Sequence, residues 1–344
     1  MTTRSSFVRE LQIVAIAIGA TVAMGSVLMI VAGVSPGHVW LHMLTRVVAS
    51  RYALGDVLFK ATAIAVTGLA VSIALDAGLF NLGVESQLTA GVVACAAVGA
   101  ALPVQTPAWI AIPLCSLAAA IAGGAFGALI GVLRVMRGAH EVITSFMFNA
   151  IVSGFALWLG NAFLFQNGTT TGPPIAPGAE LPRLGLGGSS VNAALGFAAI
   201  AAATVWYLRS RTTWGWTWRA VGHEPEAARA VGIAVGGVRI AVFAGSGALA
   251  GVAATNFVLG HAHAFQDGLG RGAGFMGVAA ALVGRLHPVG VVIAALGLGA
   301  LSVAGLAISD EAPKELVEML QGVALASIAV AAAFVRRFQS GGHP

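Results

Sequence analysis

Charged side chains are absent from long stretches of this chain. One Asp, Glu, Lys or Arg at the centre of a bilayer costs about 2.5–3.5 kcal/mol on insertion scales, so charge-free runs measure how much of a chain can lie in lipid. The long runs cover residues 11–45, 86–133, 142–179, 184–208, 240–266 and 286–309, and shorter ones cover 61–75, 272–284 and 319–335. Because one helical crossing takes roughly 20 apolar residues, this pattern predicts an all-α integral membrane protein.

We expect residues 1–344 to form a single transmembrane domain, a polytopic bundle of about ten helices. The predicted spans are 11–34, 57–75, 87–102, 108–133, 141–165, 191–208, 239–260, 273–284, 289–308 and 315–335. The shortest, 273–284, reaches only about 18 Å at 1.5 Å per residue. It is therefore predicted to be a broken or re-entrant helix.

The distribution of basic residues predicts the orientation. Arg4 and Arg9 precede a first apolar stretch that is too long for a secretory signal, so we expect a retained helix with a cytoplasmic N-terminus. Ten crossings then place the C-terminus inside as well. Of the 18 Lys and Arg residues, 12 fall inside and 6 outside, as the positive-inside rule requires. Residues 35–56 and 166–190 become extracytoplasmic loops, and 209–238 becomes a cytoplasmic loop.

Composition excludes several classes of protein. Hydrophobic residues make up 58% of the chain and charged residues 9%, against about 25% charged in globular domains, which argues against a soluble enzyme. The only cysteines, Cys95 and Cys115, leave no disulfide framework. His261 and His263 are weak evidence for a metal, so no metal site is expected. The net charge of +5 follows from the loop asymmetry and does not imply nucleic acid.

The cytoplasmic loop contains a short predicted helix. Pro225 suits a first helical turn, Glu224 and Glu226 lie at its positive end, and Gly232 stops it. Its Ala-rich face is suited to docking another protein. The alternative is an interfacial helix on the lipid headgroups, with the tryptophans of 214–218 as an aromatic belt.

The residue order in this loop resembles the coupling segment of ABC importer permeases, which seats on the ATPase subunit. The resemblance points to the branch that handles nucleosides, sugars and branched-chain amino acids. It implies a coupling helix over 219–233 that contacts the ATPase. The coupling residues are then Arg219, Gly222, Glu224, Pro225, Glu226, Ala227, Ala228, Arg229, Gly232 and Ile233.

Three further segments resemble nucleoside-type permeases. They are Asp76-Ala-Gly-Leu-Phe-Asn-Leu-Gly-Val-Glu-Ser-Gln-Leu88, His140-Glu-Val-Ile-Thr-Ser-Phe-Met-Phe-Asn149 and the Gly-rich stretch 274–290. Together with the loop they span 76–290 in family order. Ser86 and Phe148 depart from the usual Gly and Leu, and the Ser86 hydroxyl beside Glu85 bears on which solute the pathway accepts.

The intramembrane polar residues form the predicted substrate pathway, Asn81, Glu85, Gln87 and Asn149. Polar groups at membrane depth face protein or water, and amides with a carboxylate suit the hydroxyls and base edges of a neutral solute. Asn81 and Glu85 share a face if the segment is helical. The alternative is structural, with Glu85 paired to Arg134 or Arg137.

The resemblance implies a complete importer in a bacterial cytoplasmic (inner) membrane, with this chain as a multi-pass subunit among membrane lipids. Its partners are a second permease chain, related or identical, cytosolic ABC ATPase subunits and an extracytoplasmic solute-binding lipoprotein. The sequence has no Gly-x-x-x-x-Gly-Lys-[Ser/Thr] motif, so we expect no cofactor on this chain, with ATP and Mg on the partner ATPase.

The predicted function is nucleoside import by a permease subunit that is not itself an enzyme. Ribose-like sugars and branched-chain amino acids are the alternative solutes. A different class is an ATP-independent secondary carrier or channel. A membrane-embedded enzyme is a third, but the sequence has neither a Gly-x-Ser-x-Gly elbow nor a His-Glu-x-x-His helix.

Overall fold

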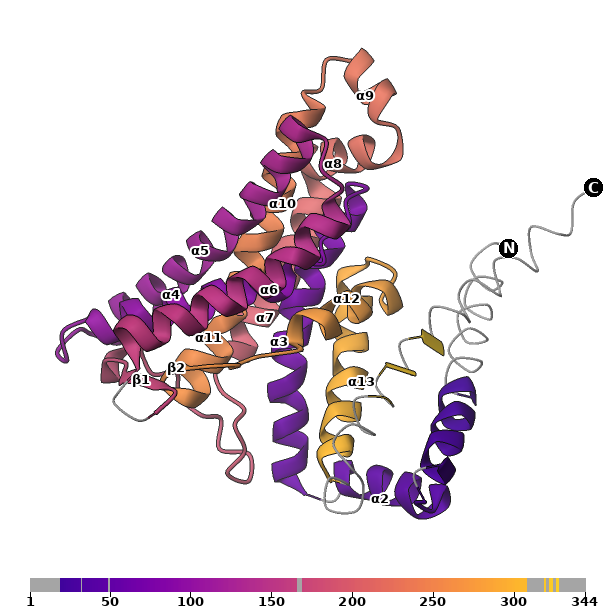
Figure 1. Ribbon diagram of the computed structural model, residues 1–344, viewed down its shortest axis with the longest axis vertical. Coiled ribbons are helices and arrows are strands. Elements are labelled where there is room, and N and C mark those ends of the chain that lie inside the picture. The colour runs from indigo at the N-terminus through magenta and orange to yellow at the C-terminus, as the bar shows by residue number, and fades with distance from the viewer. Residues whose placement is uncertain are drawn as a thin grey trace, which may run out of the picture. The chain divides into compact units, whose positions relative to one another are not determined.

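The computed structural model describes residues 19–31, 33–48, 50–165, 169–307, 319, 322–323 and 326–327. The chain divides into two compact units, one of Met1–Val57 with Ala300–Pro344 and one of Leu58–Gly299. The described part is mostly helical (Figure 1). The predicted span 315–335 and the start of 11–34 lie largely outside the described residues.

The first unit contains the helix Gly19–Val31 and α2 (Pro36–Val48). Met29, Val39, Met43 and Ala304 form its buried cluster. Residues 35–56 were predicted to be an extracytoplasmic loop between two spans; the structure places a helix within this segment, and its side of the membrane stays a prediction. Pro36 opens a helix at its first turn, and apolar side chains at helical spacing give that helix a buried face.

The second unit contains most of the remaining elements. Its long helices are α3 (Arg51–Asp76), α4 (Val84–Ala101), α5 (Ala108–Arg137), α6 (Glu141–Leu159), α7 (Ala194–Arg211), α10 (Val235–Val252) and α13 (Pro288–Ala307), of which α3 and α13 continue into the first unit. Its shorter helices are η1 (Gly160–Leu164), η2 (Pro177–Ala179), α8 (Thr213–His223), α9 (Pro225–Ala230), α11 (Ala254–Phe257), η3 (Val258–Ala262) and α12 (Ala273–Val283).

Six helices in the described ranges are long and apolar enough to cross a membrane: Arg51–Asp76, Val84–Ala101, Ala108–Arg137, Glu141–Leu164, Val235–Ala262 and Pro288–Gly305. Each coincides with a predicted span. The predicted span 191–208 corresponds to α7, and the short span 273–284 to α12, which has only 11 residues. An all-α polytopic membrane protein is therefore confirmed, while the number of about ten spans and the cytoplasmic termini stay predictions.

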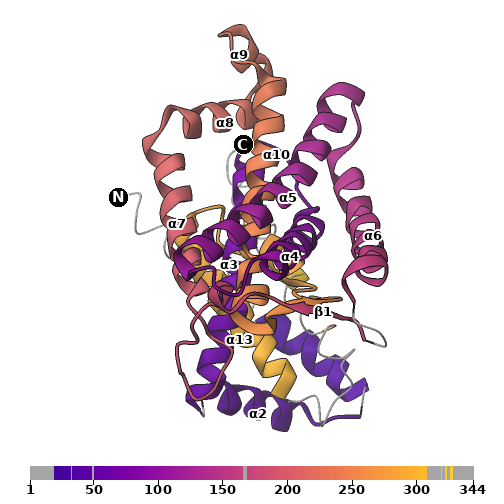
Figure 2. The same cartoon turned by 90° about the vertical axis from the view of Figure 1, so that its left-hand side faces the viewer.

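A short antiparallel sheet closes one end of the second unit. Strand β1 (Thr171–Pro174) pairs with β2 (Ala264–Gln266). The segment after β1 is bonded to neighbouring backbone, since Ala176 N–H donates to Gly99 C=O at 2.8 Å and Leu181 N–H to Leu259 C=O at 2.8 Å. Helices α8 and α9 lie at the opposite end of α5 and α10 from this sheet (Figures 1 and 2). The segment that follows β1 and the 209–238 segment thus lie at opposite ends of α5 and α10.

Glycines bring α4, α5 and α10 into backbone contact. A methyl group on Gly91 of α4 would lie 2.7 Å from Cα of Gly251 on α10, and one on Gly123 of α5 would lie 2.9 Å from the same atom. One on Gly127 would lie 3.2 Å from Cα of Gly247. Small residues at such intervals are the usual means by which membrane helices pack closely.

We predict that Gly127→Ala destabilises the protein. The added methyl would lie 3.0 Å from the carbonyl carbon of Phe243, a backbone atom that cannot rotate away. Overpacking of this kind costs about 1–3 kcal/mol. The measurement is the melting temperature of the detergent-purified protein. Gly154→Ala on α6 is the control, because its methyl meets nothing within 4 Å and should leave the melting temperature unchanged or higher. Equal melting temperatures for the two variants would contradict this packing.

Candidate functional site

The end of α3 creates a break in the helical structure. Gly78 has φ +70°, a left-handed conformation that glycine adopts without strain, and the N–H of Leu79 returns to the carbonyl of Ala74 at 2.9 Å. Residues 79–83 then lead into α4, which begins at Val84. Non-helical backbone at membrane depth needs hydrogen-bond partners inside the protein.

Asn81 supplies one of these partners and connects it to two neighbouring side chains. Its Nδ2 donates to Gln87 Oε1 at 3.0 Å and to Ser246 Oγ at 2.9 Å, while its Oδ1 accepts from Gly83 N–H at 3.0 Å. Ser246 in turn donates to the carbonyl of Ala70 at 2.6 Å. Asn81, Gln87 and Ser246 are all fully buried. This network ties the break to α3, α4 and α10.

Helix α6 holds the break from the other side. Asn149 Oδ1 accepts from Ser86 N–H and its Nδ2 donates to Leu82 C=O, both at 3.0 Å. Leu82 N–H donates to Ser145 Oγ at 3.2 Å. The Ser86 hydroxyl donates to Gly83 C=O at 2.7 Å and is fully buried. It therefore completes a helical turn here and does not line an open path.

Glu85 connects the break to a second helix start. Its Oε1 accepts from Gly272 N–H at 2.6 Å and its Oε2 from Gly274 N–H at 2.8 Å. Gly272 precedes the first residue of α12, while Glu85 lies in the first turn of α4. One carboxylate thus lies at the positive ends of two helix dipoles, where negative charge is favoured.

A small polar cavity of about 20 Å³ lies beside Glu85. Its other polar lining residues are Thr89 on α4, Ser153 on α6, and Gln266, Asp267 and Arg271 before α12. A cavity of this size holds about one water molecule. In this conformation the cavity next to Glu85 therefore has little room beyond a water molecule.

The condition for Asn81 and Glu85 to share a helical face is not met, and the alternative pairing of Glu85 with an arginine is wrong. Asn81 lies before α4 and not within it, so the two side chains do not share a helical face. Glu85 does not pair with Arg134 or Arg137, because it binds the backbone N–H groups before α12, and Arg134 lies 2.9 Å from Glu141. The partners of Glu85 and Arg134 depend on how the helices pack, which the spacing of residues along the chain does not reveal.

The segment 209–238 contains two helices, α8 and α9, where a single helix over 219–233 was expected. The chain changes direction at Glu224, whose φ of −148° is extended, because Pro225 disfavours helical backbone in the residue before it. As predicted, Pro225 opens α9 and Gly232, at φ +86°, follows its end. Trp218 is 1% exposed and packs in a core with Val221 and Phe243, so it does not belong to an aromatic belt.

Both the end of α7 and helix α8 contact the end of α3, α7 through Arg209 and α8 through Gly222. Arg209 Nε donates to Asp76 Oδ2 at 2.6 Å and Nη2 to Oδ1 at 3.2 Å. A methyl on Gly222 would lie 2.7 Å from the carbonyl carbon of Ala77 and 2.8 Å from the nitrogen of Gly78. The 209–238 segment is therefore in direct contact with the residues that lead to Asn81 and Glu85.

The outer surface of α9 carries exposed charges and is followed by one large exposed apolar side chain. Arg229 and Glu226 form an ion pair at 2.8 Å that is largely exposed, and Val231 is 73% exposed. Ala227 is exposed whereas Ala228 is 4% exposed and faces the core. Of the predicted coupling residues, Glu226, Ala227 and Arg229 are thus exposed, whereas Gly222 and Ala228 pack inward.

Sequence reasoning missed several residues of the site. Ser145 and Ser246 are ordinary serines in apolar runs, and only the fold brings them to Asn81 and Leu82. Asp76 and Arg209 were visible as opposite charges at the ends of two predicted spans. Among the described residues, no group of three or more His, Cys, Asp or Glu side chains is placed to hold a metal ion.

The chain is similar to known transport proteins over most of its length. Residues 53–329 match the family described as branched-chain amino acid transport system / permease component. A guanosine ABC transporter permease protein of Bacillus subtilis is 32% identical over 339 residues, 95% of this chain and 94% of the relative. A glucose ABC transporter permease protein of Haloferax volcanii is 31% identical, over 94% and 87% of the two chains. A nucleoside ABC transporter permease protein of Lactococcus lactis subsp. cremoris is 27% identical, over 94% and 91%.

We predict graded destabilisation from substitutions of Glu85. Ala leaves both backbone N–H groups without an acceptor, at about 1–3 kcal/mol each, whereas Gln keeps one acceptor oxygen. Thermal unfolding of the purified protein should therefore rank wild type above Glu85→Gln and Glu85→Gln above Glu85→Ala. Glu180→Ala, at an exposed carboxylate, is the control and should match wild type. An unchanged melting temperature for Glu85→Ala would refute the role given to this carboxylate.

Proposed function

The chain belongs to the family of permease components of branched-chain amino acid transport systems, and on that premise we propose that it forms the solute pathway of an ATP-driven importer for nucleosides. It is a permease subunit of an ABC transporter. The names of the guanosine and nucleoside permeases, matched over at least 94% of this chain, are the observation that carries the choice of solute. The glucose permease and the family description keep sugars and branched-chain amino acids as alternatives.

The proposed assembly contains a second permease chain, cytosolic ABC ATPases that bind ATP and Mg²⁺, and an extracytoplasmic solute-binding lipoprotein. It lies in a bacterial inner membrane, with about ten spans in this chain and both termini in the cytoplasm. The separation of β1 and β2 from α8 and α9 along the helices supports an arrangement with these segments on opposite sides of the membrane (Figure 2).

Glu85 is the residue of the predicted pathway that we place nearest to the solute. Thr89 and Ser153 line the same small cavity and offer hydroxyl groups to a neutral polar molecule. Asn81, Gln87 and Asn149 contribute to the pathway by holding the helix ends beside it, since their amide groups bond within the protein. An outward or inward opening has to widen this cavity.

The exposed surface of α9 is the proposed contact with the ATPase. Movement of α9 passes to α8, which contacts the end of α3 through Gly222, while the preceding end of α7 is bound there by the Arg209–Asp76 ion pair. From there the chain leads within ten residues to Glu85 and hence to α12. Such a connection gives the ATPase a short route, partly along the chain and partly through packed contacts, to the starts of α4 and α12, as coupling between distant sites requires.

Uptake by the reconstituted complex tests this function. Vesicles containing this chain, its permease partner and the ATPases, supplied with the binding protein, should accumulate labelled guanosine only with hydrolysable ATP. Ribose, glucose and leucine serve as alternative solutes. Faster uptake of one of these than of guanosine would overturn the choice of nucleosides as the solute. Full-rate uptake without the ATPase would show that the protein is an ATP-independent carrier.

We predict that Gly222→Ala uncouples ATP hydrolysis from transport. The methyl collides with backbone at Ala77 and Gly78 and moves α8 off α3, while the surface of α9 is unchanged. ATPase subunits should still co-purify and hydrolyse ATP, but uptake per ATP should fall about tenfold, equivalent to about 1.4 kcal/mol of coupling. Gly237→Ala is the matched control, because its methyl only reaches Ala234 Cβ at 4.0 Å. Wild-type uptake per ATP in Gly222→Ala would disprove this route.

We predict that Val231→Asp weakens ATPase binding. The substitution places a charge at an exposed apolar position of the proposed contact, where burial without a partner is unfavourable. The measurement is the amount of ATPase retained by the affinity-purified permease. Thr213→Asp adds the same charge to the exposed first turn of α8 and should leave retention intact. Equal retention by both variants would remove α9 as the contact.

A further inference from the structure

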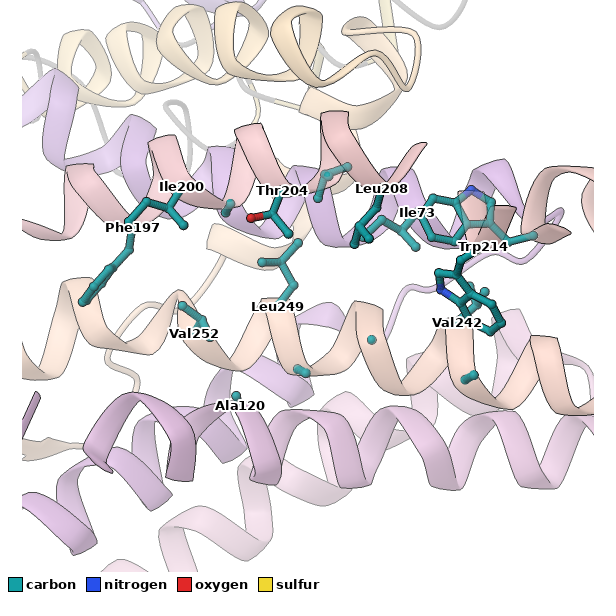
Figure 3. A pocket seen from close by; sticks show the side chains of 16 residues that line it. Ile73, Ala120, Phe197, Ile200, Thr204, Leu208, Trp214, Val242, Leu249 and Val252 are labelled. Carbon is teal, nitrogen blue, oxygen red and sulfur yellow. The ribbon is translucent and has the colours of Figure 1, made fainter. Parts of the chain in front are cut away.

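An apolar cavity of about 390 Å³ lies between α7 and α10, away from Glu85. Figure 3 shows side chains from the two helices pointing toward each other across it, among them Phe197, Ile200 and Leu208 from α7 and Leu249 and Val252 from α10. Neither the pathway nor the ATPase contact accounts for this cavity.

The cavity is long and narrow. Its lining extends from Phe197 to Leu208 on α7 and from Ala241 to Val252 on α10, roughly 17 Å of helix at 1.5 Å per residue. That is about half of a hydrocarbon core of about 30 Å. The lining is therefore a long apolar strip shared by two helices, a shape that suits a single extended hydrocarbon chain.

One end of the cavity carries a buried hydrogen-bond donor. Trp218 lines the cavity and is 1% exposed, and its Nε1 has no hydrogen-bond partner among the described residues. A buried indole N–H normally finds an acceptor. Apart from the indole nitrogens and the Thr204 hydroxyl, the lining side chains are hydrocarbon. The occupant must therefore be apolar along its length, and an acceptor oxygen at the Trp218 end would complete the hydrogen bonding of the indole.

The same end is positively charged. Helix α7 finishes at Arg211, whose exposed guanidinium lies 5.9 Å from the Trp206 ring centroid, within one turn of Leu208. Arg209 is ion-paired with Asp76. In the last turn of α7, Arg211 is therefore the cation that is available to an anion. Tryptophan and arginine at a helix end are typical of the lipid headgroup region.

We propose that this cavity binds one acyl chain of an anionic membrane phospholipid, with a lipid ester oxygen accepting from Trp218 and the phosphate near Arg211. The bound chain fills space beneath α8, because Trp218 belongs both to the cavity and to the core that seats α8. This lipid site adds to the proposed function. The proposal does not depend on which solute is transported.

Photolabelling of the purified complex in nanodiscs tests the proposal. The probe is phosphatidylglycerol with a diazirine in the middle of one acyl chain, and labelled peptides are located by mass spectrometry. We expect labels on 194–211 and 235–252. Gly245→Leu should reduce them about tenfold, because Gly245 lines the cavity and a side chain there meets no atom within 4 Å at its Cβ.

Gly196→Leu is the matched control. It adds the same side chain to an exposed position of α7 that does not line the cavity and also meets nothing within 4 Å, so labelling should stay at the wild-type level. Trp218→Phe, which keeps a ring but removes the donor, should also lower labelling. Equal labelling in wild type and Gly245→Leu, or an equal loss in both leucine variants, overturns the site in favour of ordinary boundary lipid. Crosslinking of a second protein chain into the cavity overturns it as well.

Discussion

The structure depends on satisfying the backbone of helices that stop and restart at membrane depth. Lipid offers no hydrogen bonds, so each freed N–H and C=O must find a partner in the protein. Glu85 does this for α12 while lying at the start of α4, and Asn81 and Asn149 do it for residues 81–86. Polar side chains that would be costly alone in a membrane are thereby tolerated, since each is bonded to a helix end that requires it.

The same arrangement joins the 209–238 segment to the membrane interior. Gly78 forms the turn after α3 and contacts Gly222. The turn that leads to Asn81 is therefore also the surface on which α8 packs. The ion pair of Arg209 with Asp76 is only partly exposed, with side-chain exposures of 25% and 9%, and so is less screened by water than a surface pair. A permease that must respond to a separate ATPase needs a contact of this kind.

Local patterns in the sequence predicted most helices and several of their ends. Charge-free runs located the crossings, and Pro225 and Gly232 marked the limits of α9, because helix ends depend on nearby residues. The partners of Glu85 could not be predicted, since Gly272 is 187 positions away and reaches it only when α12 packs on α4. The helix within residues 35–56 was not predicted, because at 13 residues it is too short for the span criterion used on the sequence.

The glycine contacts among α4, α5 and α10 also determine which parts of the permease are free to move. The backbones of these three helices touch at Gly91, Gly127 and Gly251 with no side chain between them, so moving one helix closer to another is blocked by backbone atoms. We therefore expect α4, α5 and α10 to move together during the transport cycle, and the left-handed glycines around them, Gly78 after α3, Gly138 between α5 and α6 and Gly272 before α12, offer positions where the chain can change direction.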